Sequence, residues 1–91
     1  MNKKKFKELY GRILRGDNKN IKFNDACAFV EELGYNLSRQ RGTSHKIYKM
    51  EGIPEIINLQ NLNGDAKPYQ IDDIRKVINK YKLGGGDSES E

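Results

Sequence analysis

The chain has 91 residues, of which 35% are hydrophobic and 33% are charged, and it contains no tryptophan. A chain of this length forms one small domain, and its regularly spaced apolar residues predict that it folds. No apolar run approaches the ~18 residues that a membrane-spanning helix needs, so we expect no membrane span. The lone cysteine, Cys27, excludes an intramolecular disulfide and an all-cysteine zinc site. Because the chain can form no internal disulfide, the single cysteine favours a cytoplasmic protein.

The charge of the chain is unevenly distributed. Its 17 lysine and arginine residues exceed its 13 acidic residues, which gives a net charge of +4. Three acids lie in residues 84–91, so ten acids remain against 17 basic residues, a net charge of +7, over residues 1–83. A domain this basic attracts polyanions such as nucleic acids. Many small soluble domains are also basic, so charge alone does not decide the function.

Two helices are predicted in the first third of the chain. The first spans Lys3 to Arg15, where one helical face carries Phe6, Leu9, Tyr10 and Ile13. The second begins with Asn24 as its N-cap and Phe23 as a hydrophobic staple, and it ends before Gly34. Its buried stripe consists of Ala26, Phe29, Val30 and Leu33. Cys27 lies in this helix and is interpreted as a small buried hydrophobic residue.

After Gly34 the apolar residues alternate, which predicts three antiparallel strands. The first runs from Tyr35 to a turn at Gly42, and the second from residue 43 to residue 50. In the second strand Ile47 and Tyr48 lie on opposite faces, so alternation does not tell which face meets the helices. Residues 55–60 form the third strand, and a polar connection follows over residues 61–66.

A last helix is predicted from Pro68, which suits a first helical turn, to Leu83. Its buried face consists of Ile71, Ile74, Val77 or Ile78, and Tyr81. Residues 84–91 form a glycine-rich acidic tail that we expect to be disordered. Residues 1–83 therefore predict a single α+β domain: two helices, a three-stranded antiparallel sheet and a last helix. Such a sheet packs one face on the helices and leaves the other open.

The predicted hairpin over residues 39–49 is basic and contains no acid. Arginine and lysine side chains contact phosphates, backbone N–H groups around a glycine add donors, and an outward-facing tyrosine stacks on a base. The candidate RNA-contacting residues are Arg39, Arg41, Gly42, Ser44, Lys46, Tyr48, Lys49 and, before the last helix, Lys67. The alternative is a solvated hairpin whose charges only keep the protein soluble.

His45 is the only histidine of the chain, and it follows a Gly-Thr-Ser turn among basic residues. A lone histidine is more often structural than catalytic. Imidazole, however, exchanges protons near neutral pH. Beside a ribose 2′-hydroxyl, His45 could act as the general base while neighbouring cations balance the charge that develops on the phosphate.

Other enzyme templates do not fit this sequence. It has no second histidine or cysteine for a zinc cluster, and no phosphate-binding loop or dinucleotide-binding glycine pattern. Asp72 and Asp73 are adjacent on a predicted helix, so their side chains diverge by ~100° instead of converging on a metal. We therefore expect neither a metal nor another cofactor.

The segment from Gly34 to Tyr48, GYNLSRQRGTSHKIY, resembles the Gly-Phe-x-x-x-Arg-x-x-Gly-Ser-His segment of HicA-type toxins. The similarity continues through the sequence INLQ at residues 57–60, Lys-Pro at residues 67–68 and Tyr-Lys-Leu at residues 81–83. Members of this family are small messenger-RNA endonucleases of type II toxin–antitoxin systems. The resemblance covers about residues 23–83, so the helix at residues 3–15 extends the family core.

The resemblance implies a fold similar to double-stranded-RNA-binding domains, with the catalytic histidine of the family at His45. It also implies an mRNA substrate, a HicB-like antitoxin that covers the active face, and no DNA contact by this chain itself. Two positions depart from the common pattern. Thr43 stands where many members have glycine, and Lys46 stands where many have a second histidine.

Two alternative functions fit the same sequence. A non-catalytic RNA-binding module would use the basic hairpin and give His45 no special role. A protein-interaction domain would instead use the helix from Phe6 to Ile13 as a groove partner. A basic helix at residues 3–15 also suits a membrane surface, although its apolar residues are more simply explained as core.

Overall fold

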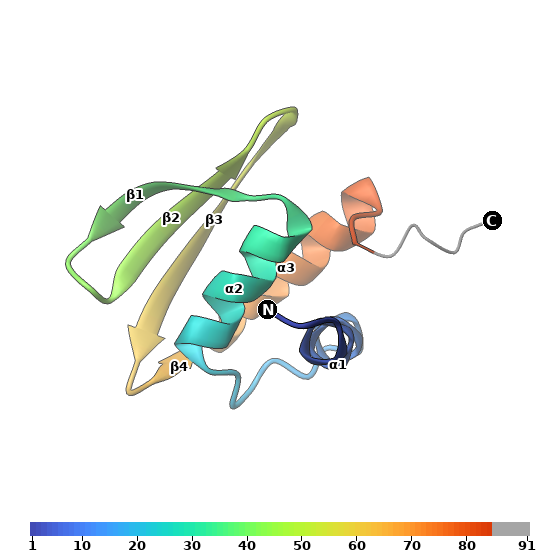
Figure 1. Cartoon of the computed structure of the whole chain (residues 1–91), viewed down its shortest axis with the longest axis horizontal. Coiled ribbons are helices and arrows are strands. Elements are labelled where there is room, and N and C mark those ends of the chain that lie inside the picture. Colours follow the sequence, from blue (N-terminus) through green and yellow to red (C-terminus); the bar gives the residue numbers. More distant parts are fainter. Residues whose placement is uncertain (85–91) are drawn as a thin grey trace.

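The structure is a computed structural model that describes residues 1–84, so the acidic tail expected to be disordered lies outside the described residues except for Gly84. Two helices, four consecutive strands and a third helix follow one another along the described chain (Figure 1). Their bounds are α1 Lys3–Leu14, α2 Phe23–Leu33, β1 Asn36–Arg41, β2 His45–Met50, β3 Ile53–Leu62, β4 Asp65–Ala66 and α3 Pro68–Tyr81.

The strands form one antiparallel sheet in the order β1-β2-β3-β4, and all three helices lie on the same side of it (Figure 1). The α+β class and the antiparallel arrangement are therefore confirmed. The expected number of three strands is wrong, because Asp65 and Ala66 pair back onto Leu62 and Asn61. Between them Asn63 and Gly64 both adopt positive φ angles, which closes a tight turn. The sequence did not predict β4, because a strand of two residues is too short to show an alternation of apolar and polar residues.

Helix α1 begins at Asn2, whose side-chain oxygen accepts a hydrogen bond from the backbone N–H of Lys5 at 2.8 Å. Its apolar face packs against the other helices. The ring of Phe6 stacks on that of Phe29 with a centroid distance of 4.8 Å, and the Tyr10 hydroxyl donates to the carbonyl of Leu83 at 2.8 Å. This face therefore belongs to the core, which removes the basis for a groove-binding or membrane-binding α1.

The N-cap of helix α2 lies two residues earlier than the sequence predicts. Lys22 occupies the N-cap, and Asn24 lies inside the helix. The cause is tertiary: Phe23 is 3% exposed, and its N–H donates to the carbonyl of Gly64 in the β3–β4 turn at 2.9 Å. The predicted C-terminal glycine is confirmed, since Gly34 has a φ of 117° that other residues rarely adopt.

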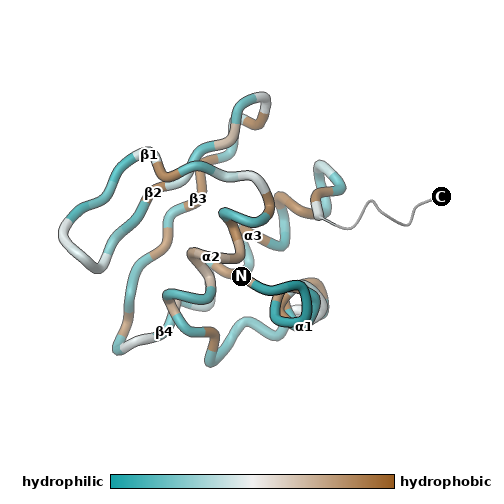
Figure 2. The backbone as a smooth tube through the Cα atoms, in the orientation of Figure 1, coloured by the Kyte–Doolittle hydropathy of each residue, from teal (hydrophilic) through white to brown (hydrophobic). Residues whose placement is uncertain are grey.

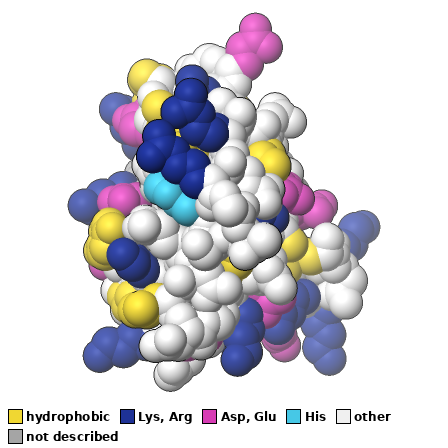
Figure 3. Space-filling view, turned by 90° about the vertical axis from the view of Figure 1, so that its left-hand side faces the viewer, with side chains coloured by type: hydrophobic (Ala, Val, Ile, Leu, Met, Phe, Trp, Pro, Cys, Tyr) yellow, Lys and Arg dark blue, Asp and Glu magenta, His cyan; other side chains and the backbone are white. Residues whose placement is uncertain are grey.

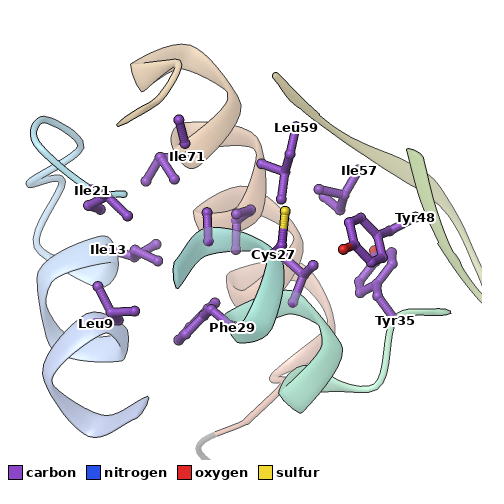
Figure 4. Close-up of a cluster of buried hydrophobic side chains, with 14 of the residues drawn as sticks. Leu9, Ile13, Ile21, Cys27, Phe29, Tyr35, Tyr48, Ile57, Leu59 and Ile71 are labelled. Atoms are coloured by element: carbon purple, nitrogen blue, oxygen red, sulfur yellow. The ribbon is translucent and has the colours of Figure 1, made fainter. Parts of the chain in front are cut away.

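The core lies between the helices and one face of the sheet, here called the inner face (Figure 4). Its fully buried side chains include Ile13, Phe29, Val30, Tyr48, Ile57, Leu59, Ile71 and Ile74. Cys27 is buried as predicted. Burial raises the pKa of its thiol, while the Tyr48 hydroxyl and the charge of Lys46 oppose that rise. Figure 2 shows that apolar residues recur along α2 and α3, whereas the ends of β1 and β2 on either side of the pale hairpin turn are hydrophilic.

Tyr48 anchors β2 to α2. Its ring is 0% exposed, and its hydroxyl donates to the Glu31 carboxylate at 2.8 Å. Burial is the first cause that raises the pKa of this hydroxyl, and the hydrogen bond to Glu31 is the second. The residue therefore supplies a large apolar surface to the core and a polar contact at its rim.

Glu55 joins β3 to α3. Its carboxylate accepts hydrogen bonds from the Lys80 ammonium at 2.7 Å and from the Tyr81 hydroxyl at 2.6 Å. Its backbone carbonyl accepts from the Tyr35 hydroxyl at 3.2 Å. The hydrogen bond from Lys80, followed by that from Tyr81, lowers the pKa of Glu55.

A side chain of helix α3 forms a hydrogen bond with the backbone of β3 on the side that points away from β2. The side chain of Gln70, 2% exposed, accepts from the backbone N–H of Gln60 at 2.8 Å and donates to its side-chain oxygen at 3.0 Å. The sequence did not predict this buried polar residue, because a glutamine in the first turn of a helix is normally exposed. Within residues 1–84, every helix is too short or too polar to cross a membrane.

Substitution of Tyr48 tests its role in the core. We expect Tyr48→Ala to lower the free energy of unfolding by about 3–5 kcal/mol, because a fully buried ring is lost. Tyr48→Phe, which removes only the hydrogen bond to Glu31, should cost about 1 kcal/mol. Urea denaturation measures both values. Tyr69→Ala is the matched control, since that ring is 59% exposed. Equal effects of Tyr48→Ala and Tyr69→Ala would contradict the buried position.

The Glu55 contacts predict a pH dependence of stability. Because the folded-state pKa of Glu55 is lowered, its stabilising effect is complete above the ordinary glutamate pKa and is lost as the pH falls through the folded value. Acidification should therefore reduce the free energy of unfolding more steeply in the parent than in Glu55→Gln. Urea denaturation across the acid range measures this difference. Lys80→Met should likewise weaken the dependence of the free energy of unfolding on pH. Parallel pH curves for the parent and both variants would refute the stabilising role of the Glu55 contacts.

Candidate functional site

The register of the sheet places His45 on the face that the helices leave open, here called the outer face. His45 pairs with Arg41 on β1 and with Gln60 on β3, and residues directly opposite each other share a face. Two residues along β2, Ile47 pairs with Arg39 and Asn58, which adds these side chains to the same face. The outer face around His45 thus combines two guanidinium groups with two amides.

A β-bulge in β1 places Leu37 and Arg39 on opposite faces of the sheet. The register shifts between Leu37 and Arg39, so Leu37 lies opposite the buried Tyr48 while Arg39 lies opposite Ile47. Regular alternation along a strand would place Leu37 and Arg39 on one face. The extra residue at the bulge separates them, so Leu37 turns to the inner side while Arg39 stays on the face of Arg41.

The turn before His45 is fixed by hydrogen bonds. Gly42 adopts a φ of 60°, and its carbonyl accepts from the side-chain amide of Gln40 at 2.9 Å. The carbonyl of Ser44 accepts from the backbone N–H of Asn61 at 2.9 Å, which ties the turn to β3. Gly42 and Ser44 are exposed, so both predicted contact residues of the turn are accessible.

The imidazole of His45 is half-buried and reachable from solvent. Its Nε2 lies 3.4 Å from Oδ1 of Asn58. Within residues 1–84, no carboxylate forms a hydrogen bond or ion pair with His45. Figure 3 shows the histidine beside a cluster of lysine and arginine side chains. If Oδ1 of Asn58 accepts a hydrogen bond from Nε2–H, the neutral ring leaves Nδ1 unprotonated.

The basic side chains of the outer face are exposed. In the described part of the chain, Arg39, Arg41 and Lys49 form no ion pair, and all three are exposed. Lys49 lies opposite Asn36 at the far end of β2 from His45. An anion that approaches the outer face therefore meets basic side chains that are not paired with a carboxylate of residues 1–84.

Two predicted contact residues lie on the inner side of β2. Tyr48 is wrong as a base-stacking residue, because its ring is fully buried and its hydroxyl is bonded to Glu31. Lys46 is half-buried and, two residues before Tyr48, lies on the same side of β2. Burial raises the pKa of the Cys27 thiol on α2, and the positive charge of Lys46 opposes that rise. Lys46 therefore does not join His45 on the outer face.

Lys67 is the N-cap of α3 and is half-buried. One turn later, Gln70 contacts Gln60, the cross-strand neighbour of His45. The structure thus places Lys67 at the same end of the sheet as His45, although these residues are far apart in the sequence.

Sequence reasoning missed Asn58 and Gln60 as neighbours of His45. The available signal was the alternation of β3, where Ile57 and Leu59 are buried and the residues between and after them point outward. The signal became useful only once the β2–β3 register was known.

Other features lie apart from His45. A groove of about 470 Å³ at the opposite end of β1 and β2 is lined by residues that include Leu37, Lys49, Pro54 and Ile56. Among residues 1–84, no three His, Cys, Asp or Glu side chains lie close enough together to hold a metal ion.

Comparisons of this chain with models of known protein families, with curated proteins and with solved structures found no match. The resemblance to HicA-type toxins therefore stays a prediction from the sequence.

Proposed function

We propose that this chain is a HicA-like toxin of a type II toxin–antitoxin system, a metal-independent endoribonuclease that cleaves mRNA in the cytoplasm. The observation that carries the proposal is the position of His45 on the outer face, solvent-accessible and opposite Arg41. A histidine kept for structure alone would normally be packed and hydrogen-bonded inside the protein. His45 is instead half-buried on the outer face, beside a cluster of lysine and arginine side chains.

The proposed reaction needs one base and an anion-stabilising surface. His45 removes the proton of a ribose 2′-hydroxyl, and the 2′-oxygen forms a bond to the adjacent phosphorus. The bond from phosphorus to the 5′-oxygen breaks, and that oxygen takes up a proton. The products are a 2′,3′-cyclic phosphate and a 5′-hydroxyl end.

Arg41, opposite His45, and Arg39, the next outward residue of β1, supply the positive charge. Guanidinium groups that face the phosphate stabilise the additional negative charge of the transition state. Lys46, Tyr48 and water were the candidate acids for the leaving oxygen. Tyr48 is buried and Lys46 belongs to the inner side of β2, so water is the remaining candidate.

A fold similar to double-stranded-RNA-binding domains is part of the proposal. Its support is a sheet with helices on one face only, which leaves the other face for RNA. The proposed protein partner is a HicB-like antitoxin that covers the outer face and neutralises its basic side chains.

A non-catalytic RNA-binding module is the second candidate. One observation favours it: among the described residues, we find no side chain on the outer face placed to act as the general acid that would protonate the leaving 5′-oxygen while His45 acts as the base. This module would use Arg39 and Arg41 in the same way, and its expression would not arrest growth.

The histidine is tested by cleavage of RNA in the presence of EDTA. We expect His45→Ala to reduce the cleavage rate about 10²–10⁴-fold, the range for a positioned general base, while RNA affinity changes little. Lys19→Ala, an exposed change in the loop after α1, is the control that should cleave like the parent. Equal cleavage by parent and His45→Ala would overturn the mechanism, and 5′-phosphate products would indicate attack by water instead.

The basic surface is tested by the salt dependence of RNA binding. For a labelled 2′-O-methyl RNA, which lacks the nucleophile, each of Arg39→Ala and Arg41→Ala should lower the slope of log K against log salt by about 0.7, if each arginine neutralises one phosphate. Lys7→Ala, which removes an exposed charge from α1, should leave the slope unchanged. Fluorescence anisotropy measures the affinities. Identical slopes for all variants would place the RNA elsewhere.

A further inference from the structure

The burial of Tyr48 leaves a different tyrosine available for base stacking. Tyr69, in the first turn of α3, is 59% exposed, and every other aromatic residue in the described part of the chain is buried or half-buried. An exposed ring contributes little to the core. Its position is therefore informative about function.

A continuous set of contacts connects Tyr69 to His45. The Tyr69 hydroxyl lies 3.5 Å from the side-chain nitrogen of Gln70, and the same nitrogen donates to Oε1 of Gln60 at 3.0 Å. Gln60 is in turn the cross-strand neighbour of His45. The hydroxyl end of Tyr69 thus borders the side chain that lies next to the imidazole.

The surroundings of Tyr69 are suited to a nucleotide. Lys67, two residues earlier, provides a positive charge, and the first turn of α3 contains no acid. Gln70 is buried and bonded twice to Gln60, so the beginning of α3 is held against the end of β3. A ring anchored on such a rigid turn loses little conformational freedom when a base stacks on it.

We propose that Tyr69 is a base-stacking residue that holds one base of a single-stranded RNA while the neighbouring backbone lies at His45 and Arg41. The inference rests on the proposed function, and it extends the RNA-contacting surface from the β1–β2 hairpin to the beginning of α3. Because every base has a π-face, this contact favours an unpaired nucleotide without selecting one base strongly. The expected substrate is therefore an unpaired segment of mRNA.

The test measures binding of a fluorescein-labelled 2′-O-methyl RNA of mixed sequence by anisotropy. Tyr69→Ala should weaken binding about 5- to 150-fold, the range expected for one lost stack, whereas Tyr69→Phe and Tyr69→Trp should bind like the parent. Leu14→Ala, which removes an exposed apolar side chain from α1, is the matched control and should have no effect. Circular dichroism verifies that every variant is folded.

A second RNA separates stacking from a structural or purely electrostatic role. With an abasic oligonucleotide of the same backbone, the difference between parent and Tyr69→Ala should disappear, because no base is present to stack. Unchanged binding of intact RNA by Tyr69→Ala, or equally weak binding by Tyr69→Phe, would overturn the inference. So would a persistent difference on the abasic RNA.

The cleavage experiment on His45 keeps this inference distinguishable from the proposed function. If His45→Ala cleaves like the parent while Tyr69→Ala binds weakly, the catalytic proposal fails and the stacking residue stands. If the parent itself binds no RNA, both are wrong.

Discussion

The packing of the Tyr48 ring under α2 decides which side chains lie on the outer face of the sheet. Side chains alternate along a strand, so a ring packed under α2 at position 48 requires His45 and Ile47 to point the other way. A shift of one residue would turn His45 toward the helices and Tyr48 toward the solvent. The hydroxyl of Tyr48 adds specificity, since its bond to Glu31 on α2 is satisfied only in the observed orientation.

The outer face then gathers residues from separate parts of the chain. Arg41 and Gln60 flank His45 from neighbouring strands, and Asn58 approaches its Nε2. The beginning of α3 joins this face through Gln70. On the side of β3 that points away from β2, the side-chain oxygen of Gln70 accepts the hydrogen bond from the backbone N–H of Gln60 that a strand would otherwise accept. Because this amide is buried and bonded, it holds helix and sheet together where the proposed RNA would pass.

The same division of the sheet explains how a small basic domain can fold and still present its charge. The helices cover the inner face and pack against its apolar side chains, and within residues 1–84 the arginines of β1 on the outer face form no ion pair. Unpaired cations cost little when exposed to water, and they attract anions over distances of about a Debye length, ~8 Å at physiological salt. Stability and the proposed binding of RNA therefore depend on opposite faces of one sheet.

The sequence by itself determined the three helices, the glycine that ends α2, the β1–β2 hairpin and the burial of Cys27, because these depend on local spacing and backbone conformation. It predicted His45 within a basic turn, but not which face of β2 that residue occupies. Ile47 and Tyr48 are both apolar, and only packing against α2 and Ile57 decided between them. The β4 pairing, the earlier beginning of α2 and the buried Gln70 likewise required tertiary contacts, since each depends on residues distant in the sequence.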